Sequence, residues 1–137
     1  MRTTRIIGLL WPLAAILALG GCGLTGPAHD APSAQAAAVV DMGFTSFEPE
    51  VVHIRAGQTV QWRNTALITH AVSDNKVSAA DPKDASVPAG AVAFDSGDIP
   101  AGEVYSATFT VPGTYKYFCP HHEDDDMVGT VVVDPAS

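Results

Sequence analysis

Apolar and polar residues alternate in several short segments of the chain after residue 38. Alternation with a period of two indicates β-strands that bury one face and expose the other, as in antiparallel sheets. The pattern is clearest at residues 59–64, where Val60 and Trp62 share one face and Gln61 and Arg63 share the other, which is expected to face solvent. At residues 103–111, Tyr105 and Phe109 share a face. Strands are predicted at residues 39–47, 51–55, 59–64, 92–95, 103–111, 114–118 and 128–133.

Turn residues separate these segments. Glu48-Pro49-Glu50, Ala56-Gly57-Gln58 and Pro112-Gly113 each interrupt the alternation, and residues 73–91 form a long Ser-, Asp-, Pro- and Gly-rich stretch without a hydrophobic pattern. No segment has a convincing helical period. Many short strands with frequent turns predict an all-β protein, a Greek-key β-sandwich of seven or eight strands.

The N-terminal segment has the features of an export signal. Residues 1–5 are basic, residues 6–19 are apolar, and Leu19-Gly20-Gly21 precede Cys22. The apolar run is too short for a comfortable transmembrane helix. Small residues before a cysteine resemble the lipobox of bacterial lipoproteins, which implies a signal peptide over residues 1–21 and a lipidated Cys22 as the first mature residue. An ordinary signal peptide or an uncleaved anchor is the alternative.

The segment after Cys22 is not expected to join a core. Residues 22–38 are rich in Ala, Pro, Ser and Gly, and they predict a flexible linker between the lipid and a single folded domain at residues 39–137. The domain would then sit outside the cell's cytoplasm, anchored by lipid to the outer face of the cytoplasmic membrane. We expect it to be a monomer.

The charge of the chain bears on its partners. The formal net charge is −8, and removal of residues 1–21, which carry Arg2 and Arg5 and no acidic residue, leaves −10. Such an acidic surface argues against binding nucleic acid and against electrostatic adhesion to anionic lipid. It is compatible with docking onto a partner protein that has a basic surface.

One short stretch, YKYFCPHHEDDDMVG at residues 115–129, carries the candidate chemistry. Cys119, His122 and Met127 lie within nine residues, and if Cys22 carries lipid, Cys119 is a lone exported thiol that metal binding would protect. Thiolate and thioether are soft ligands and imidazole is borderline, a mixture that copper accepts in both oxidation states. A His₂Cys site with a long axial Met needs one more histidine, and His70 is the candidate.

Several of these segments together resemble a known family. The resemblance is carried by residues 47–64, by His70-Ala71-Val72, by VPGTYKYFC at residues 111–119, by His122 and by MVGTVVV at residues 127–133. From about residue 39 to residue 134 the chain resembles a cupredoxin of the plastocyanin and pseudoazurin type. The resemblance implies one type 1 copper ion held by His70, Cys119, His122 and Met127. It also places His70 beside Cys119, which spacing alone does not do.

The sequence departs from the family pattern at a few positions. His121 occupies the position usually taken by proline and is the alternative to His122 as ligand, although the family spacing favours His122. Ala71 stands where relatives commonly have an asparagine that ties the ligand loops together, and Asn64 or Asn75 could stabilise the site instead. The acidic run at residues 123–126 is either a solvated loop or a feature that lowers the potential and attracts a cationic partner.

Two functions remain open from the sequence. The first is a one-electron carrier that shuttles electrons between redox proteins, and the second is a copper-binding protein for copper delivery or resistance. The single cysteine between an aromatic strand and a tight loop, with too few methionines for an open cluster, favours the carrier. No second copper motif, nucleophile with a nearby base or phosphate-binding glycine loop is visible, so we do not expect an enzyme.

Overall fold

The structure is a computed structural model that describes residues 35–137. The predicted signal peptide at residues 1–21, the proposed lipidation at Cys22 and most of the predicted linker at residues 22–38 lie outside the described residues. These assignments therefore stay predictions, as does the boundary of the folded domain at residue 39. Among residues 35–137, no helix has the length and apolar character needed to cross a membrane.

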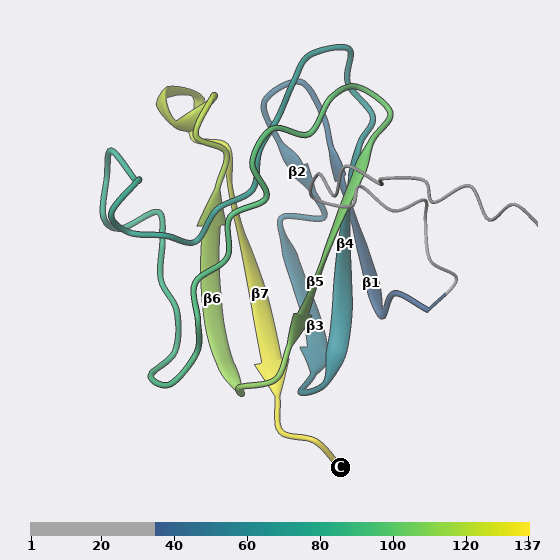
Figure 1. The fold of residues 1–137 in the computed structure, drawn as a ribbon, viewed down its shortest axis with the longest axis vertical. Coiled ribbons are helices and arrows are strands. Elements are labelled where there is room, and N and C mark those ends of the chain that lie inside the picture. The colour runs from purple at the N-terminus through teal and green to yellow at the C-terminus, as the bar shows by residue number, and fades with distance from the viewer. Residues whose placement is uncertain (1–34) are drawn as a thin grey trace, which may run out of the picture.

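The described residues form two β-sheets that enclose a common core (Figure 1). A four-stranded sheet has the order β2-β1-β4-β5, and a three-stranded sheet has the order β3-β7-β6. The strands are β1 (Ala38–Met42), β2 (Phe47–Glu48), β3 (Val51–Arg55), β4 (Gln58–Asn64), β5 (Val104–Phe109), β6 (Gly113–Phe118) and β7 (Val128–Asp134). The prediction of an all-β sandwich with seven or eight strands is confirmed.

The sheets mix parallel and antiparallel pairs because the chain crosses repeatedly between them. β1 is parallel to β4 and β3 is parallel to β7, whereas β4–β5 and β6–β7 are antiparallel. The alternation at residues 59–64 predicted that Gln61 faces solvent, and this prediction was wrong. Gln61 is only 1% exposed, and its amide Nε2 donates to Ser106 Oγ at 3.3 Å across the β4–β5 pair.

Two predicted strands differ from the structure. The segment 39–47 is divided into β1 and β2 by a tight turn, in which the Gly43 amide donates to the Ser46 carbonyl at 2.8 Å. Residues 92–95 form no strand and contribute only an isolated bridge between Asp95 and Ser73. In this segment the Phe94 carbonyl accepts from the Asp74 amide at 3.3 Å, so its hydrogen bonds serve the loop after β4 rather than a sheet.

Aromatic side chains fill the core between the sheets. Trp62 and Tyr117 are both fully buried, and their ring centroids lie 5.3 Å apart at an angle of 85°. Such edge-to-face packing is the favoured arrangement for aromatic pairs. Tyr117 lies opposite Gly129 in the β6–β7 pair, where its ring fills the space that a side chain at residue 129 would need.

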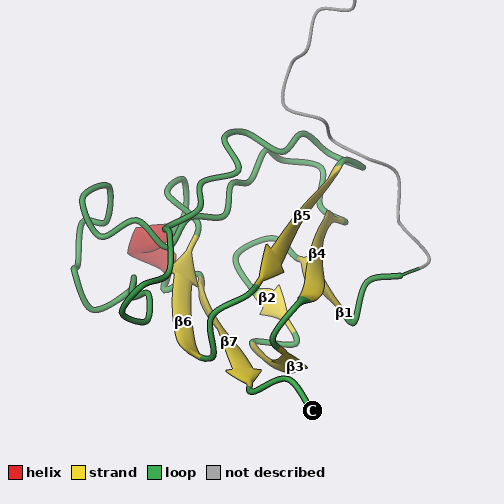
Figure 2. Ribbon diagram, turned by 60° about the horizontal axis from the view of Figure 1, so that its bottom comes forward, coloured by secondary structure: helices red, strands yellow, loops and turns green. Residues whose placement is uncertain are grey.

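Two long connections reach the end of the sandwich where β6 ends (Figure 2). One is the connection between β6 and β7, which contains a single turn of 3-10 helix, η1 (Glu123–Asp125). The other is the connection between β4 and β5, which begins there and then runs along β6, where Ser86 bridges Lys116. The rigid strands thus deliver several irregular segments to one end of the molecule. Candidate ligands from both connections meet there.

Candidate metal centre

The four predicted ligands come from the two connections at this end of the sandwich. Cys119 directly follows the last residue of β6, and Met127 directly precedes the first residue of β7. His122 lies between them, at the residue before η1. His70 lies in the connection that follows β4 and forms an isolated bridge with Ile99.

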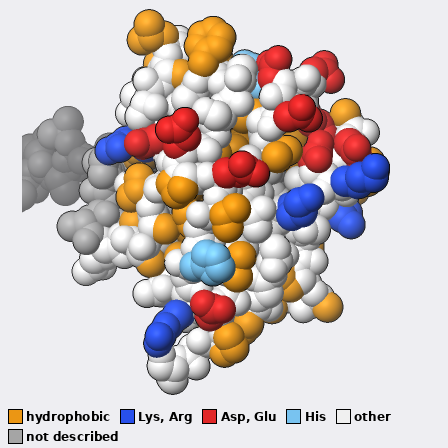
Figure 3. All heavy atoms as spheres, turned by 180° about the vertical axis from the view of Figure 1, so that it is seen from behind, with side chains coloured by type: hydrophobic (Ala, Val, Ile, Leu, Met, Phe, Trp, Pro, Cys, Tyr) orange, Lys and Arg blue, Asp and Glu red, His pale blue; other side chains and the backbone are white. Residues whose placement is uncertain are grey.

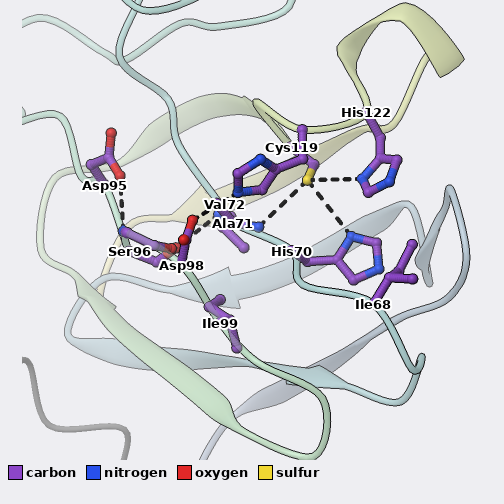
Figure 4. Close-up of polar contacts among 12 residues, drawn as sticks. Ile68, His70, Ala71, Val72, Asp95, Ser96, Asp98, Ile99, Cys119 and His122 are labelled. Carbon is purple, nitrogen blue, oxygen red and sulfur yellow. Dashed lines mark hydrogen bonds and ion pairs between the residues drawn. The ribbon is translucent and has the colours of Figure 1, made fainter.

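The structure brings the two histidines and the cysteine together (Figure 4). Cys119 Sγ lies 3.6 Å from Nδ1 of His70 and 3.6 Å from Nδ1 of His122. The ligand atoms of the three residues all lie within 4.8 Å of one another, and the two imidazole centroids are 4.9 Å apart. One sulfur and two nitrogens therefore converge on a single small volume, which is the donor set of a His₂Cys copper site.

Met127 is placed beside this cluster by backbone hydrogen bonds. Its amide donates to the His122 carbonyl at 3.2 Å, and its carbonyl accepts from the Cys119 amide at 3.0 Å. Its side chain is fully buried. The short loop from Cys119 to Met127 thus closes on itself, and its first and last residues are held next to each other at the site.

The surroundings of the cluster disfavour charge on the isolated side chains. Burial raises the pKa of the Cys119 thiol above its ordinary value. Burial also lowers the pKa of His70, and the nearby His122 imidazole lowers it further. A buried thiolate is costly unless a cation compensates its charge, and a bound copper ion would supply that compensation. The donor set and its environment therefore fit a copper ion.

Backbone contacts join the segment after His70 to the segment that carries Cys119. The Ala71 amide donates to Cys119 Sγ at 3.4 Å, and the Ser73 and Phe118 backbones exchange hydrogen bonds of 3.0 and 2.9 Å. The Val72 amide donates to the hydroxyl of Ser96 at 2.8 Å, a partner that the sequence analysis did not identify. These contacts tie the loops together although Ala71 lacks the side-chain amide that the family resemblance leads us to expect there.

Asn64 fixes the loop that leads to His70. Its Nδ2 donates to the carbonyls of Ile68 and Ile99 at 2.8 Å each, and its Oδ1 accepts from the Ala66 amide at 3.0 Å. Ile99 in turn exchanges two backbone hydrogen bonds with His70, at 3.1 and 2.7 Å. Of the two asparagines considered from the sequence, Asn64 therefore has the contacts of a residue that orients a ligand.

Asn75 has a different, more local set of contacts. Its Oδ1 accepts from the Val77 amide at 3.0 Å, and its own amide donates to Ser73 Oγ at 3.2 Å. These hydrogen bonds shape the turn after the His70 segment and do not reach the ligands. The expectation for a stabilising asparagine is thus met by Asn64.

Three further features of this end of the molecule were not foreseen. His121 Nε2 lies 2.7 Å from the Asp98 carboxylate, so its ring is engaged away from the sulfur, and His121 is not part of the converging cluster. The two Glu123 carboxylate oxygens accept backbone amides of the 73–91 loop. Asp74 is 1% exposed, and burial raises its pKa to about 6.

A β-sandwich with a buried His₂Cys cluster and an adjacent buried Met defines the class of small copper-binding redox proteins. Residues 34–134 match the family described as copper binding proteins, plastocyanin/azurin family. The chain belongs to this family. The predicted copper cofactor and the cupredoxin resemblance are therefore confirmed at the level of the family, and the family consists of electron carriers rather than enzymes.

Individual relatives agree with this assignment. The chloroplastic plastocyanin of Tetradesmus obliquus is 41% identical over 93 residues, which cover 68% of this chain and 61% of that protein. The plastocyanin of Scenedesmus fuscus is 40% identical over 93 residues, covering 68% of this chain and 91% of that protein. A reduced amicyanin variant superposes with a TM-score of 0.60 at 28% identity, over 79% of this chain and 95% of that one.

Proposed function

We propose that the protein is a type 1 copper protein that carries single electrons between redox partners. The observation that carries the proposal is the position of Cys119 Sγ, 3.6 Å from Nδ1 of both His70 and His122 in a largely buried cluster. In this proposal His70, Cys119 and His122 are the three strong ligands. Met127 supplies the weak fourth contact, which tunes the potential more than the affinity.

The scaffold suits electron transfer because it holds its ligands in place in either oxidation state. Copper in such a site supplies the one-electron Cu(I)/Cu(II) couple. The protein's contribution is to fix the ligands by strand ends and backbone hydrogen bonds, so that little rearrangement accompanies the change of charge. Burial of His70, Cys119 and Met127 also keeps water from the sulfur ligands.

His122 is the ligand nearest to solvent and is the expected point of electron exit. It is partly exposed, whereas the other three proposed ligands are buried. Phe44 and Leu67 are 71% and 95% exposed, and their loops lie at the same end of the sandwich as the ligand loops (Figure 1). Exposed apolar side chains at the same end as a partly exposed ligand offer a surface on which a partner can approach the metal.

Acidic side chains give this end a negative field. Asp124, Asp125 and Asp126 are exposed in or next to η1, and red side chains gather beside exposed hydrophobic ones in Figure 3. The pKa of Asp84 is raised, first by burial and then by neighbouring carboxylates that include Asp81. A concentration of carboxylates supports the proposal that the redox partner docks through a basic surface.

Export and lipid attachment complete the proposal. The N-terminal signal and the Leu19-Gly20-Gly21-Cys22 segment support anchoring of the protein by a lipid on Cys22 to the outer face of the cytoplasmic membrane. Metabolic labelling with a clickable fatty acid checks this assignment. The native protein should be labelled and sediment with membranes, and Cys22→Ser should abolish both.

The carrier function is tested by electron exchange with small oxidants of opposite charge. We expect the reduced, copper-loaded protein to react with a cationic cobalt(III) complex at a rate that falls as ionic strength rises. Changing Asp124, Asp125 and Asp126 together to Asn should slow this reaction and speed the reaction with anionic ferricyanide. Asp134→Asn, at the end of β7 away from Met127, is the control and should have less effect per charge removed. Failure to exchange electrons with either oxidant would contradict the carrier function.

A further inference from the structure

The residue before His122 is held by a contact to a distant segment. His121 Nε2 lies 2.7 Å from Asp98 Oδ1, and the two side chains are 43% and 72% exposed. An ionised carboxylate only accepts hydrogen bonds, so the His121 ring nitrogen must donate. This contact therefore needs no particular charge on the imidazole.

The residue after His122 is held by a second contact, to a different segment. The two carboxylate oxygens of Glu123 accept the amides of Ala80 and Asp81, at 2.9 and 3.0 Å. Hydrogen bonds from backbone amides to a carboxylate are stronger than those between neutral groups. Glu123 is thus committed to the 73–91 loop, unlike the neighbouring Asp124, for which no side-chain contact is seen among the described residues.

The Asp98 contact also reaches the other histidine ligand. The next residue, Ile99, donates its amide to the His70 carbonyl at 2.7 Å and accepts from the His70 amide at 3.1 Å. Asp98 and His70 appear together in Figure 4, on the two segments that this pair of hydrogen bonds joins. The Asp98–His121 contact consequently links the segment bonded to His70 with the loop that carries His122.

His122 has little other support. It lies outside any strand, its amide donates to the Cys119 carbonyl at 3.0 Å, and its carbonyl accepts from the Met127 amide at 3.2 Å. Both bonds stay within the short ligand loop. Its ring packs against the His70 imidazole, with centroids 4.9 Å apart, but the hydrogen bonds that join this part of the loop to other segments come through its two chain neighbours.

We propose that Asp98 and Glu123 are positioning residues that clamp the ligand loop from both sides and thereby fix the orientation of the His122 imidazole toward Cys119 Sγ. We call the contacts Asp98–His121 and Glu123–Ala80/Asp81 the His122 clamp. The effect of the clamp on copper binding rests on the proposed function. The contacts that form the clamp are present in the chain without a metal. Partners that orient metal ligands commonly affect metal retention and electronic structure more than they affect folding. An exposed ion pair also contributes little to unfolding free energy.

Two pairs of variants separate positioning from charge. Asp98→Ala removes both the acceptor and the charge, whereas Asp98→Asn keeps an acceptor oxygen for His121. Glu123→Ala removes the two amide contacts, whereas Asp124→Ala removes a charge from the same turn without touching the clamp. If the clamp positions His122, the first variant of each pair should differ from the native protein in amide exchange of the ligand loop and in copper binding. The second variant of each pair should behave like the native protein.

The first readout is amide hydrogen exchange in the metal-free full chain, which does not depend on copper. Exchange of the His122, Asp125 and Asp126 amides, which all donate within the ligand loop, should be several-fold faster in Asp98→Ala and Glu123→Ala. The same amides in Asp98→Asn and Asp124→Ala should exchange at native rates. Equal rates in all four variants and the native protein would overturn the clamp.

The second readout uses the copper-loaded protein. Asp98→Ala and Glu123→Ala should lose copper to a chelator roughly tenfold faster, and their Cu(II) electron paramagnetic resonance spectra should broaden as His122 takes several orientations. A native spectrum and native copper loss in both would contradict the proposal, as would an Asp98→Asn variant that behaves like Asp98→Ala. Failure of the proposed function shows separately, as absence of the type 1 spectrum in the native protein.

Discussion

The Ala71 amide donates to Cys119 Sγ at 3.4 Å, and this contact connects residues 48 positions apart in the sequence. It brings the segment after one histidine ligand to the sulfur of the cysteine ligand. A donor to a thiolate stabilises negative charge on the sulfur, and hydrogen bonding around the cysteine is one of the factors that set the potential of such a site. The backbone of the His70 segment is therefore part of the metal's environment, and residues that hold this segment act on the site.

Asn64 is the side chain that holds this segment most firmly. Asn64→Ala removes three hydrogen bonds and leaves the buried Ile99 carbonyl with one donor fewer. At about 1 kcal/mol for each bond, we expect the free energy of unfolding to fall by about 2–4 kcal/mol. Urea unfolding monitored by tryptophan fluorescence measures the change.

A matched control for this variant is Asn75→Ala. Within the described part of the chain Asn75 makes one side-chain hydrogen bond, to the Val77 amide in an exposed turn. Its loss should therefore change the unfolding free energy by no more than about 0.5 kcal/mol. Similar losses in the two variants would mean that Asn64 has no special role in holding the His70 loop.

Gly129 is required by the close approach of Tyr117. A methyl group at residue 129 would overlap Tyr117 Cζ and Oη, and the Tyr117 ring is fully buried in the core. Gly129→Ala should therefore lower the free energy of unfolding by roughly 1–3 kcal/mol through overpacking. Because β7 begins directly after Met127, the copper spectrum should shift as well. Thr130→Ala, the neighbour on the opposite face of β7, should leave both the stability and the spectrum close to native.

The buried carboxyl of Asp74 predicts an unusual pH dependence of stability. Its Oδ1 accepts from the Phe94 amide at 2.7 Å, and its Oδ2 is buried without a hydrogen-bond partner among the described residues. Burial, as the largest cause, raises its pKa from 3.8 to about 6, and the charge of Asp95 adds to the rise. Between about pH 4 and pH 6 the folded protein keeps a proton that the unfolded chain releases, so this group makes stability fall as pH rises through that window.

Asp74→Asn tests this directly, because an amide does not titrate and keeps an acceptor for Phe94. The fall in unfolding free energy between pH 4 and pH 6 should shrink by up to about 3 kcal/mol. Denaturant unfolding at several pH values, with Asp95→Asn for comparison, gives the slopes. An unchanged slope in Asp74→Asn would show that the carboxyl is already ionised or is reached by water in the folded protein.

Much of the fold followed from the sequence because strand periodicity and turn residues are local signals. The segments at residues 51–55, 59–64, 103–111, 114–118 and 128–133 all contain strands at nearly the expected places. The order in which the strands pair in the two sheets could not be predicted from these local signals. Gln61 lies on a face that looks solvated from alternation alone, but tertiary packing buries it.

The site was predictable where its residues are close in sequence. Cys119, His122 and Met127 lie on one loop, so their spacing indicates a common metal, whereas His70 needed the family resemblance to join them. The Asp98–His121 contact and the Glu123 contacts could not be predicted, because they connect separate loops that have no periodic pattern. Residues 123–126 are all acidic in the sequence, and nothing in that run distinguishes Glu123, whose carboxylate accepts two backbone amides in the structure.

The most direct test of the copper site is the visible spectrum of the purified protein after addition of one equivalent of Cu(II). We predict an intense absorption in the red region, produced by charge transfer from the Cys119 thiolate to copper, and its loss in Cys119→Ser. The same absorption should disappear on reduction and return on oxidation. Stoichiometric copper binding without that absorption, or an unchanged absorption in Cys119→Ser, would contradict a type 1 site formed by His70, Cys119, His122 and Met127.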